Sequence, residues 1–115
     1  MTAALPVTDA TFVEVVLASP VPVVVDFWAQ WCAPCRVIGP VLDELAGVYD
    51  GRVRFVAVDA DDNPGLVARF GIVALPTLHL YAGGELVEAV YGARPKSELG
   101  DRVEGLLAAV GGPSA

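Results

Sequence analysis

Strand-like apolar runs alternate with helical patterns along this chain, and no other feature limits its possible folds as strongly. Residues 21–28 form a run that is apolar on both faces of a predicted strand except at Asp26, and residues 53–58 form a second buried run. Strands buried on both faces occur in sheets that helices cover, and intervening helices supply the crossovers that parallel pairing needs. The pattern therefore predicts an α/β fold, with a central mixed β-sheet flanked by helices on both faces.

Two helices are predicted around the second strand-like run. Apolar residues recur at helical spacing over residues 37–49; Pro40 is expected to kink this helix and Asp50-Gly51 to end it. A shorter helix is expected to begin at Asn63-Pro64, a capping residue followed by proline, and to end at Gly71.

The last part of the chain is expected to add a hairpin and a helix. Gly83-Gly84 separate residues 77–81 from residues 86–91, which predicts two antiparallel strands at one edge of the sheet. A first helix and a short strand before residue 8 are also expected. The first helix is capped by Thr8 or Asp9 and has the apolar face Phe12, Val13, Val16 and Leu17; the final helix has the apolar face Leu99, Val103, Leu106, Leu107 and Val110.

Length and charge exclude several classes of protein. At 115 residues the chain has the size of a single domain, residues 1–115, which would bury roughly 65% of its unfolded surface. Its net charge of −7, from 7 basic and 14 acidic residues, argues against binding to nucleic acid or to an anionic membrane. No apolar run approaches the ~20 residues that span a membrane, and no secretory signal is recognised. We therefore expect a cytoplasmic protein, and we expect it to be a monomer.

The two cysteines, Cys32 and Cys35, directly follow the strand predicted over residues 21–28. Two intervening residues at the start of a helix allow a disulfide, and the free N–H groups and dipole there favour an anion at Cys32. A stabilised thiolate is a better nucleophile at neutral pH. Cys35 lies one turn deeper and is expected to be the shielded thiol that resolves a mixed disulfide. Pro34 suits the start of the helix and stiffens the loop.

A zinc site and an inert disulfide are the alternatives for this pair. Zinc needs about four ligands, and the chain has only two cysteines and one histidine. A four-residue disulfide loop stabilises a fold little compared with a long one. A CxxC beside a βαβ pattern therefore favours redox catalysis, with no metal.

Asp26 is the one acid in a run that otherwise suits a buried strand. A buried carboxylate is costly unless it is protonated or paired. Burial raises its pKa, which suits proton transfer near neutrality. The structural alternative is an aspartate at a strand end, hydrogen-bonded to a turn.

Further motifs complete a family pattern that includes this acid and the cysteine pair. With them the chain resembles the thioredoxin family over about residues 8–110. A CxxC alone has low specificity, but the aromatic-flanked pair, the internal acid and a Pro-Thr about 40 residues later are together very specific. The matching segments are 23–29 (VVVDFWA), 31–36 (WCAPCR), 59–64 (DADDNP), 70–72 (FGI) and 75–77 (LPT), with Gly84 and Gly92.

The resemblance implies the thioredoxin fold and dithiol–disulfide exchange. Cys32 would attack a substrate disulfide, Cys35 would release the product, and Asp26 beneath them would relay a proton to or from Cys35. No cofactor is implied beyond the redox-active disulfide; thioredoxin reductase would recycle the protein, and disulfide-containing proteins would be its substrates. Leu75-Pro76 resembles the family's cis-proline. The implied docking surface comprises Trp31, Ala33, Pro34, Leu75, Pro76, Gly92 and Ala93, with Trp28 and Pro40 as structural support.

Two positions depart from the family pattern. Ala33 stands where the family usually has glycine, between the cysteines, where the residues tune the redox potential. Ala57 stands where many members have lysine, and strand alternation can place it near Asp26. Without a cation there, we expect the pKa of Asp26 to be raised.

Other candidate residues have simpler readings. His79 is expected to be a packed or surface strand residue, because it has no partner for catalysis. The acidic cluster Asp59, Asp61 and Asp62 is expected to be solvated rather than to hold a cation. Trp31 is expected at an exposed rim.

Two other functions compete with a disulfide reductase. One is a disulfide oxidase or isomerase, but those relatives typically have histidine where this chain has Pro34. The other is a non-catalytic module that binds a partner through the apolar face around Trp31. Retention of both cysteines argues against the module.

Overall fold

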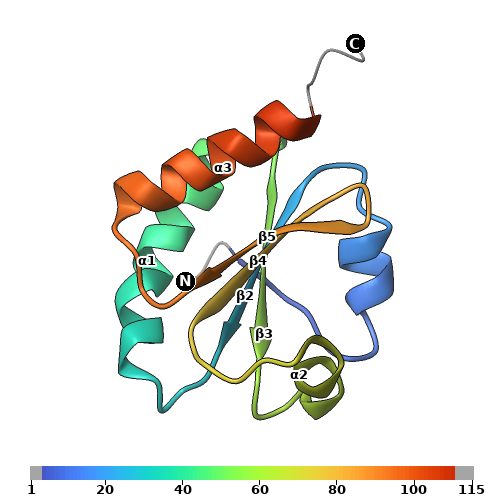
Figure 1. Ribbon diagram of the computed structural model, residues 1–115, viewed down its shortest axis with the longest axis vertical. Coiled ribbons are helices and arrows are strands. Elements are labelled where there is room, and N and C mark those ends of the chain that lie inside the picture. Colours follow the sequence, from blue (N-terminus) through green and yellow to red (C-terminus); the bar gives the residue numbers. More distant parts are fainter. Residues whose placement is uncertain (1–3, 111–115) are drawn as a thin grey trace.

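The computed structural model describes residues 4–110, whose five strands form one mixed sheet in the order β1-β3-β2-β4-β5 (Figure 1). β1 and β2 both pair in parallel with β3, whereas β4 is antiparallel to β2 and β5. The expected hairpin and the short strand before residue 8 are both confirmed. The strands are β1 (Leu5–Pro6), β2 (Val23–Trp28), β3 (Arg54–Asp59), β4 (Thr77–Ala82) and β5 (Glu85–Tyr91).

Helices cover both faces of this sheet, as predicted. α1 and α3 lie on one side, and η1 and α2 lie on the other (Figure 1). The helical elements are η1 (Val13–Leu17), α1 (Ala33–Val48), α2 (Pro64–Phe70) and α3 (Lys96–Val110). None of the helices within residues 4–110 is long and apolar enough to cross a membrane.

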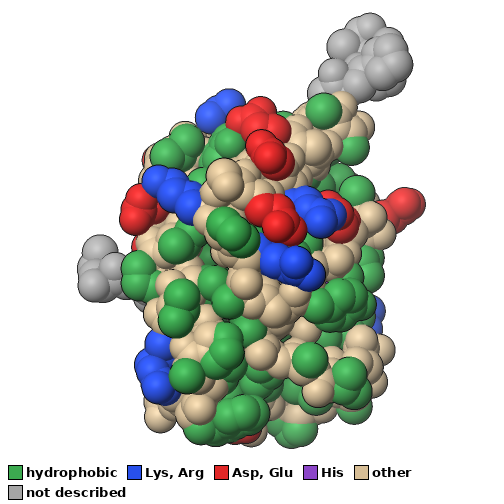
Figure 2. Space-filling model, turned by 60° about the vertical axis from the view of Figure 1, so that its left-hand side comes forward, with side chains coloured by type: hydrophobic (Ala, Val, Ile, Leu, Met, Phe, Trp, Pro, Cys, Tyr) green, Lys and Arg blue, Asp and Glu red, His purple; other side chains and the backbone are tan. Residues whose placement is uncertain are grey.

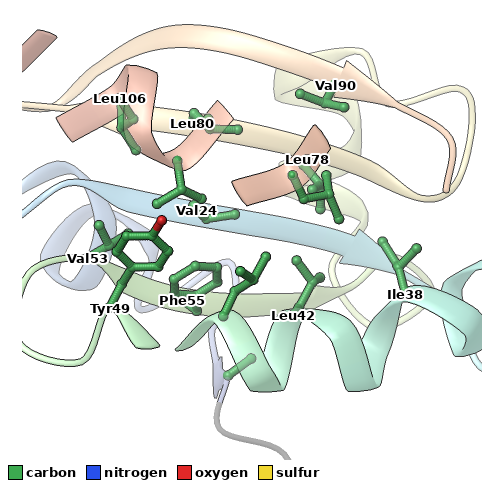
Figure 3. Packing of buried hydrophobic residues seen from close by; sticks show 14 residues of the cluster. Val24, Ile38, Leu42, Tyr49, Val53, Phe55, Leu78, Leu80, Val90 and Leu106 are labelled. Atoms are coloured by element: carbon green, nitrogen blue, oxygen red, sulfur yellow. The ribbon is translucent and has the colours of Figure 1, made fainter. Parts of the chain in front are cut away.

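β2 is buried on both faces because it lies in the middle of the sheet. Its Val24 packs with Ile38 and Leu42 of α1 in the cluster on the α1/α3 side (Figure 3). Its Val25 and Phe27 belong to the cluster on the η1/α2 side. Burying each such side chain stabilises the fold by about 1.5–3 kcal/mol, so β2 is held in a fixed register. That register places Asp26 on the α1/α3 side, where the cysteine helix lies.

The first helical segment differs from the prediction in the face that it buries. Phe12 and Val16 are buried as expected, but Val13 is 58% exposed. The segment is a short π-helix, whose i→i+5 bonds wind the chain more loosely than an α-helix. The α-helical spacing that we used to assign the apolar face does not apply to such a turn, so assigning Val13 to it was wrong. In α1, Val37 likewise lies on the exposed side, and the exposed Pro40 lies within the helix.

Asp9 caps a helix, but not the predicted one. Its carboxylate accepts hydrogen bonds from the backbone N–H groups of Gly65 (3.2 Å) and Leu66 (2.8 Å), at the start of α2. Asn63 occupies the N-cap position of α2 without capping it. Its side chain instead accepts from the N–H of Asp9 (2.9 Å) and donates to the carbonyl of Asp59 (2.9 Å). The capping prediction for Asn63 was therefore wrong. Asp9, which is 54 positions earlier in the chain, accepts the hydrogen bonds from the first N–H groups of α2 in its place.

Candidate active site

Cys32 and Cys35 form a disulfide across the first turn of α1, with their Cα atoms 5.3 Å apart. This separation lies in the usual range for a disulfide. The pair lies shortly after the end of β2 in the chain. Ala29 and the half-buried Trp28 pack against the two cysteines and so join the strand end to the helix start. A buried strand and a helix start thus hold the two sulfur atoms together.

The two sulfur atoms are not equivalent. Cys32 is the N-cap residue of α1, in an extended backbone conformation, and its Sγ accepts a hydrogen bond from the backbone N–H of Cys35 at 3.2 Å. A donor at a helix N-terminus stabilises negative charge on that sulfur. We had expected Cys35 to be the more shielded thiol, but both residues are only 4% exposed, so this expectation was wrong. The difference between them lies in position on the helix.

Asp26 lies on the same side of the sheet as the cysteine helix and is 8% exposed. Burial raises its pKa from 3.8 to about 7, and repulsion from Asp43 adds to the shift. The raised pKa agrees with the expectation. In the β2–β3 register, Asp26 pairs with Ala57, so the residue expected nearby does lie beside it. The carboxyl and Cys35 line one cavity.

The loop before β4 approaches the same end of the sheet. The Leu75–Pro76 peptide bond is cis, and the carbonyl of Pro76 accepts from the N–H of Gly92 at 2.9 Å. The φ of Gly92 is +80°, which favours glycine there. Leu75 packs against the cluster of Ala29 and the disulfide.

Most of the expected docking residues are accessible. Trp31 is 69% exposed, which confirms the prediction of a rim residue, and Ala33, Pro34 and Ala93 are exposed too. Leu75 and Gly92 are half-buried, whereas Pro76 is buried. Charged side chains gather over α3 at one end of the face in Figure 2, and the end where α1 begins is mostly uncharged. The surroundings of the disulfide are therefore suited to apolar contacts.

Two interactions at the site could not have been predicted from the sequence. The indole N–H of Trp31 donates to Asp61 Oδ2 at 2.8 Å, so an acid from the cluster at 59–62 holds the exposed ring. Asp43 acts on Asp26 from α1. Both pairs are far apart in the chain, and no local spacing connects their members.

The remaining candidates have structural surroundings. His79 is 4% exposed and packs edge-on against Phe27 and Phe70, with ring centroids 5.1 and 5.9 Å away, which confirms a packed strand residue. Within the described residues, no three His, Cys, Asp or Glu side chains are placed to hold a metal ion.

A family model described as Thioredoxin matches residues 3–105. The chain belongs to the thioredoxin family. Thioredoxin 1 from Nostoc sp. is 49% identical over 104 residues, which cover 90% of this chain and 97% of that protein. Thioredoxin from Synechocystis sp. is 46% identical over 107 residues, covering 93% and 100%. The chloroplastic M-type thioredoxin of Chlamydomonas reinhardtii is 46% identical over 101 residues, covering 88% and 72%.

Family membership and the disulfide pair together establish the activity. Thioredoxins are protein-disulfide oxidoreductases, and this chain carries the cysteine pair at disulfide distance. It is a protein-disulfide reductase of the thioredoxin type, whose redox chemistry uses its own cysteines.

Proposed function

We propose that Cys32 is the attacking nucleophile of this reductase and that Cys35 is the resolving thiol. The observation that carries the assignment is the hydrogen bond from the Cys35 N–H to Cys32 Sγ at the start of α1. This donor stabilises a thiolate at Cys32 rather than at Cys35. The Cys32 thiolate attacks a substrate disulfide, forms a mixed disulfide and releases one substrate thiolate.

The second step returns the site to its oxidised form. Cys35 loses its proton to the Asp26 carboxylate, and the Cys35 thiolate attacks Cys32 Sγ. The bond between Cys32 and the substrate breaks, the second substrate thiol leaves, and the Cys32–Cys35 disulfide forms. Two electrons have then passed to the substrate. A carboxyl with a pKa of about 7 can both accept and return this proton near neutral pH.

Partners and surroundings follow from the same chemistry. Thioredoxin reductase restores the dithiol by supplying two electrons, and disulfide-containing proteins dock on the apolar rim around Trp31 and Pro34. No further cofactor takes part. The cytoplasm is a reducing compartment, where a CxxC pair is redox-active rather than structural. A net charge of −7 favours a monomer, and a length of 115 residues is that of one domain.

Insulin reduction tests the assignment of the two thiols. The dithiothreitol-reduced protein should reduce insulin disulfides rapidly. The Cys35→Ser variant should stall as a mixed disulfide through Cys32, detected as an added insulin chain by mass spectrometry, and Cys32→Ser should form no such adduct. Turnover no faster than with dithiothreitol alone would overturn the proposal and favour a partner-binding module.

A further inference from the structure

A cavity of about 280 Å³ lies beside the disulfide, between α1 and the β2–β3 strands. Asp26 and Cys35 form part of its wall, and most of the rest is apolar, including Trp28, Leu42 and Ala57. The rim residues Trp31 and Pro34 are not among the described residues that line this cavity.

A buried polar atom in the cavity wall has no partner among the described residues. Asp26 Oδ1 is buried and accepts no hydrogen bond. A buried polar group left without a partner costs free energy, and such groups call for an explanation such as a bound ligand. Ala57, which pairs with Asp26 across the β2–β3 register, is too short to supply a donor. A donor that enters the cavity, either water or a ligand, is therefore needed to satisfy this oxygen.

The charges around the cavity favour a cation. Asp43 also lines the cavity and raises the pKa of Asp26 by repulsion. Among the described lining residues, Arg36 is the one basic side chain; its guanidinium donates to the carbonyl of Gln30 at 2.6 Å, and it is not among the causes of the pKa shift of Asp26. Cys35 is the remaining titratable group and is neutral in the disulfide. Two carboxyl groups thus lie in the described wall of the cavity, and one acts on the other.

We propose that this cavity binds an unbranched primary alkylammonium group, whose nitrogen donates to Asp26 while its carbon chain lies along the apolar wall. An ammonium has three donors and no acceptor, and an alkyl stem suits apolar walls. A hard metal ion such as Ca²⁺ would need six to eight oxygen ligands, which the described lining residues do not supply. The group is the end of a lysine side chain or a free aliphatic amine.

An ammonium group bound in the cavity would affect the transfer of the proton from Cys35 to Asp26. A bound cation favours the charged form of Asp26, so the carboxyl would become a weaker acceptor for the Cys35 proton. This consequence rests on the proposed function, whereas the binding itself does not.

Carboxyl NMR on the oxidised protein tests the binding directly. With n-butylamine at millimolar to tens of millimolar concentration, the pKa of Asp26 should fall by about one pH unit, as expected for an adjacent opposite charge. n-Butanol and sodium chloride at the same ionic strength should leave it unchanged. An equal response to n-butanol would show an apolar cavity without ammonium recognition, and no response to the amine would show no site; either result overturns the proposal.

Two glycines of α1 give matched variants for the position of the site. Gly39 lines the cavity and Gly47 does not, and a Cβ at either meets nothing within 4 Å. Gly39→Leu should abolish the response to n-butylamine, and Gly47→Leu should retain it. A response that survives Gly39→Leu would place the amine on the surface and overturn the proposal.

A short peptide with one lysine distinguishes the two sources of the group. A pKa response to both peptide and free amine supports a lysine side chain, and a response to the amine alone supports a free amine. Insulin reduction by the same samples without amine reports separately on the proposed function.

Discussion

Asp26 and His79 are buried ionisable side chains on adjacent strands, and the sheet separates them. Asp26 of β2 pairs with Leu78 and faces α1, whereas His79 of β4 pairs with Val25 and faces η1 and α2. Each has an atom without a hydrogen-bond partner in the described structure, Oδ1 in Asp26 and Nδ1 in His79. Burial favours the neutral form of both, raising the pKa of Asp26 and lowering that of His79.

The difference between the two sites lies in what surrounds the buried group. Asp26 lines a solvent-open cavity that it shares with a redox-active cysteine. His79 lies among the rings of Phe27, Phe70 and Tyr81, at 5.1–6.3 Å between centroids. A perturbed pKa alone is therefore weak evidence for function; a route for the proton and a reacting neighbour distinguish the acid from the histidine.

The largest effect is expected from Asp26→Asn, which removes the charge and keeps the shape of the side chain. The pKa is 3.8 in the unfolded chain and about 7 in the fold. The stabilising effect of the protonated carboxyl is complete below pH 3.8 and is lost as the pH rises through 7. Relative to the variant, the wild type should lose up to about 4 kcal/mol of unfolding free energy between pH 4 and pH 8.

Urea unfolding at both pH values measures this difference. Insulin reduction by Asp26→Asn should also be slower, because Cys35 loses its proton acceptor. A wild type whose stability follows the variant at both pH values would show that Asp26 ionises as freely as in water. Direct titration of its carboxyl near pH 4 would lead to the same conclusion.

The next largest effect is expected on the pKa of Asp26 when a lysine is introduced on its own face of the sheet. Ala57 pairs with Asp26, and Ala89 pairs with His79. Ala57→Lys should lower the pKa of Asp26 by about one pH unit or more, since an adjacent positive charge favours the carboxylate. Ala89→Lys is the matched control and should leave that pKa unchanged. Carboxyl NMR measures the pKa of Asp26 in both variants. Equal shifts of that pKa would contradict the separation of the two sites by the sheet.

A smaller effect is expected from His79→Phe, which keeps the ring contacts and removes the titrating group. The pKa of His79 is lowered by burial, so its neutral form stabilises the fold above pH 6.5. That contribution is lost as the pH falls through the lowered pKa, because the unfolded chain binds the proton more readily. The variant should be less sensitive to acid between pH 7.5 and pH 5, seen in urea unfolding as a smaller loss of unfolding free energy than in the wild type. Its insulin reduction should match that of the wild type, and a clear loss would assign His79 a functional role.

The smallest effect is expected from Tyr81→Phe in the same aromatic group. The hydroxyl of Tyr81 is buried without a hydrogen-bond partner in the described structure, and burial raises its pKa to about 12. Removing a polar group that has no partner should be neutral or stabilise the fold by up to about 1 kcal/mol. Thermal unfolding at pH 7 measures the change. A large loss of stability would reveal a partner for the hydroxyl.

Local patterns explain why much of the fold could be predicted. Helical spacing located α1, and the glycine pair located the β4–β5 hairpin, because both depend on residues within a few positions of each other. The same reasoning failed at Val13, where the chain forms a π-helix. It failed again at Asn63, because the N–H groups at the start of α2 donate to Asp9 instead. The first failure comes from a helix type other than the assumed α-helix, and the second comes from a contact between residues far apart in the chain.

The candidate site divides in the same way. The sequence alone determined the cysteine pair at a helix start, an acid inside a buried strand, and the proline loop that completes the family pattern. Only the tertiary structure decided that Ala57 lies beside Asp26, that Asp43 acts on it, that Asp61 holds Trp31, and that a cavity opens behind Cys35. Periodicity reports which residues share a face of one element. Strand register and helix packing decide which faces meet, and they depend on the whole chain.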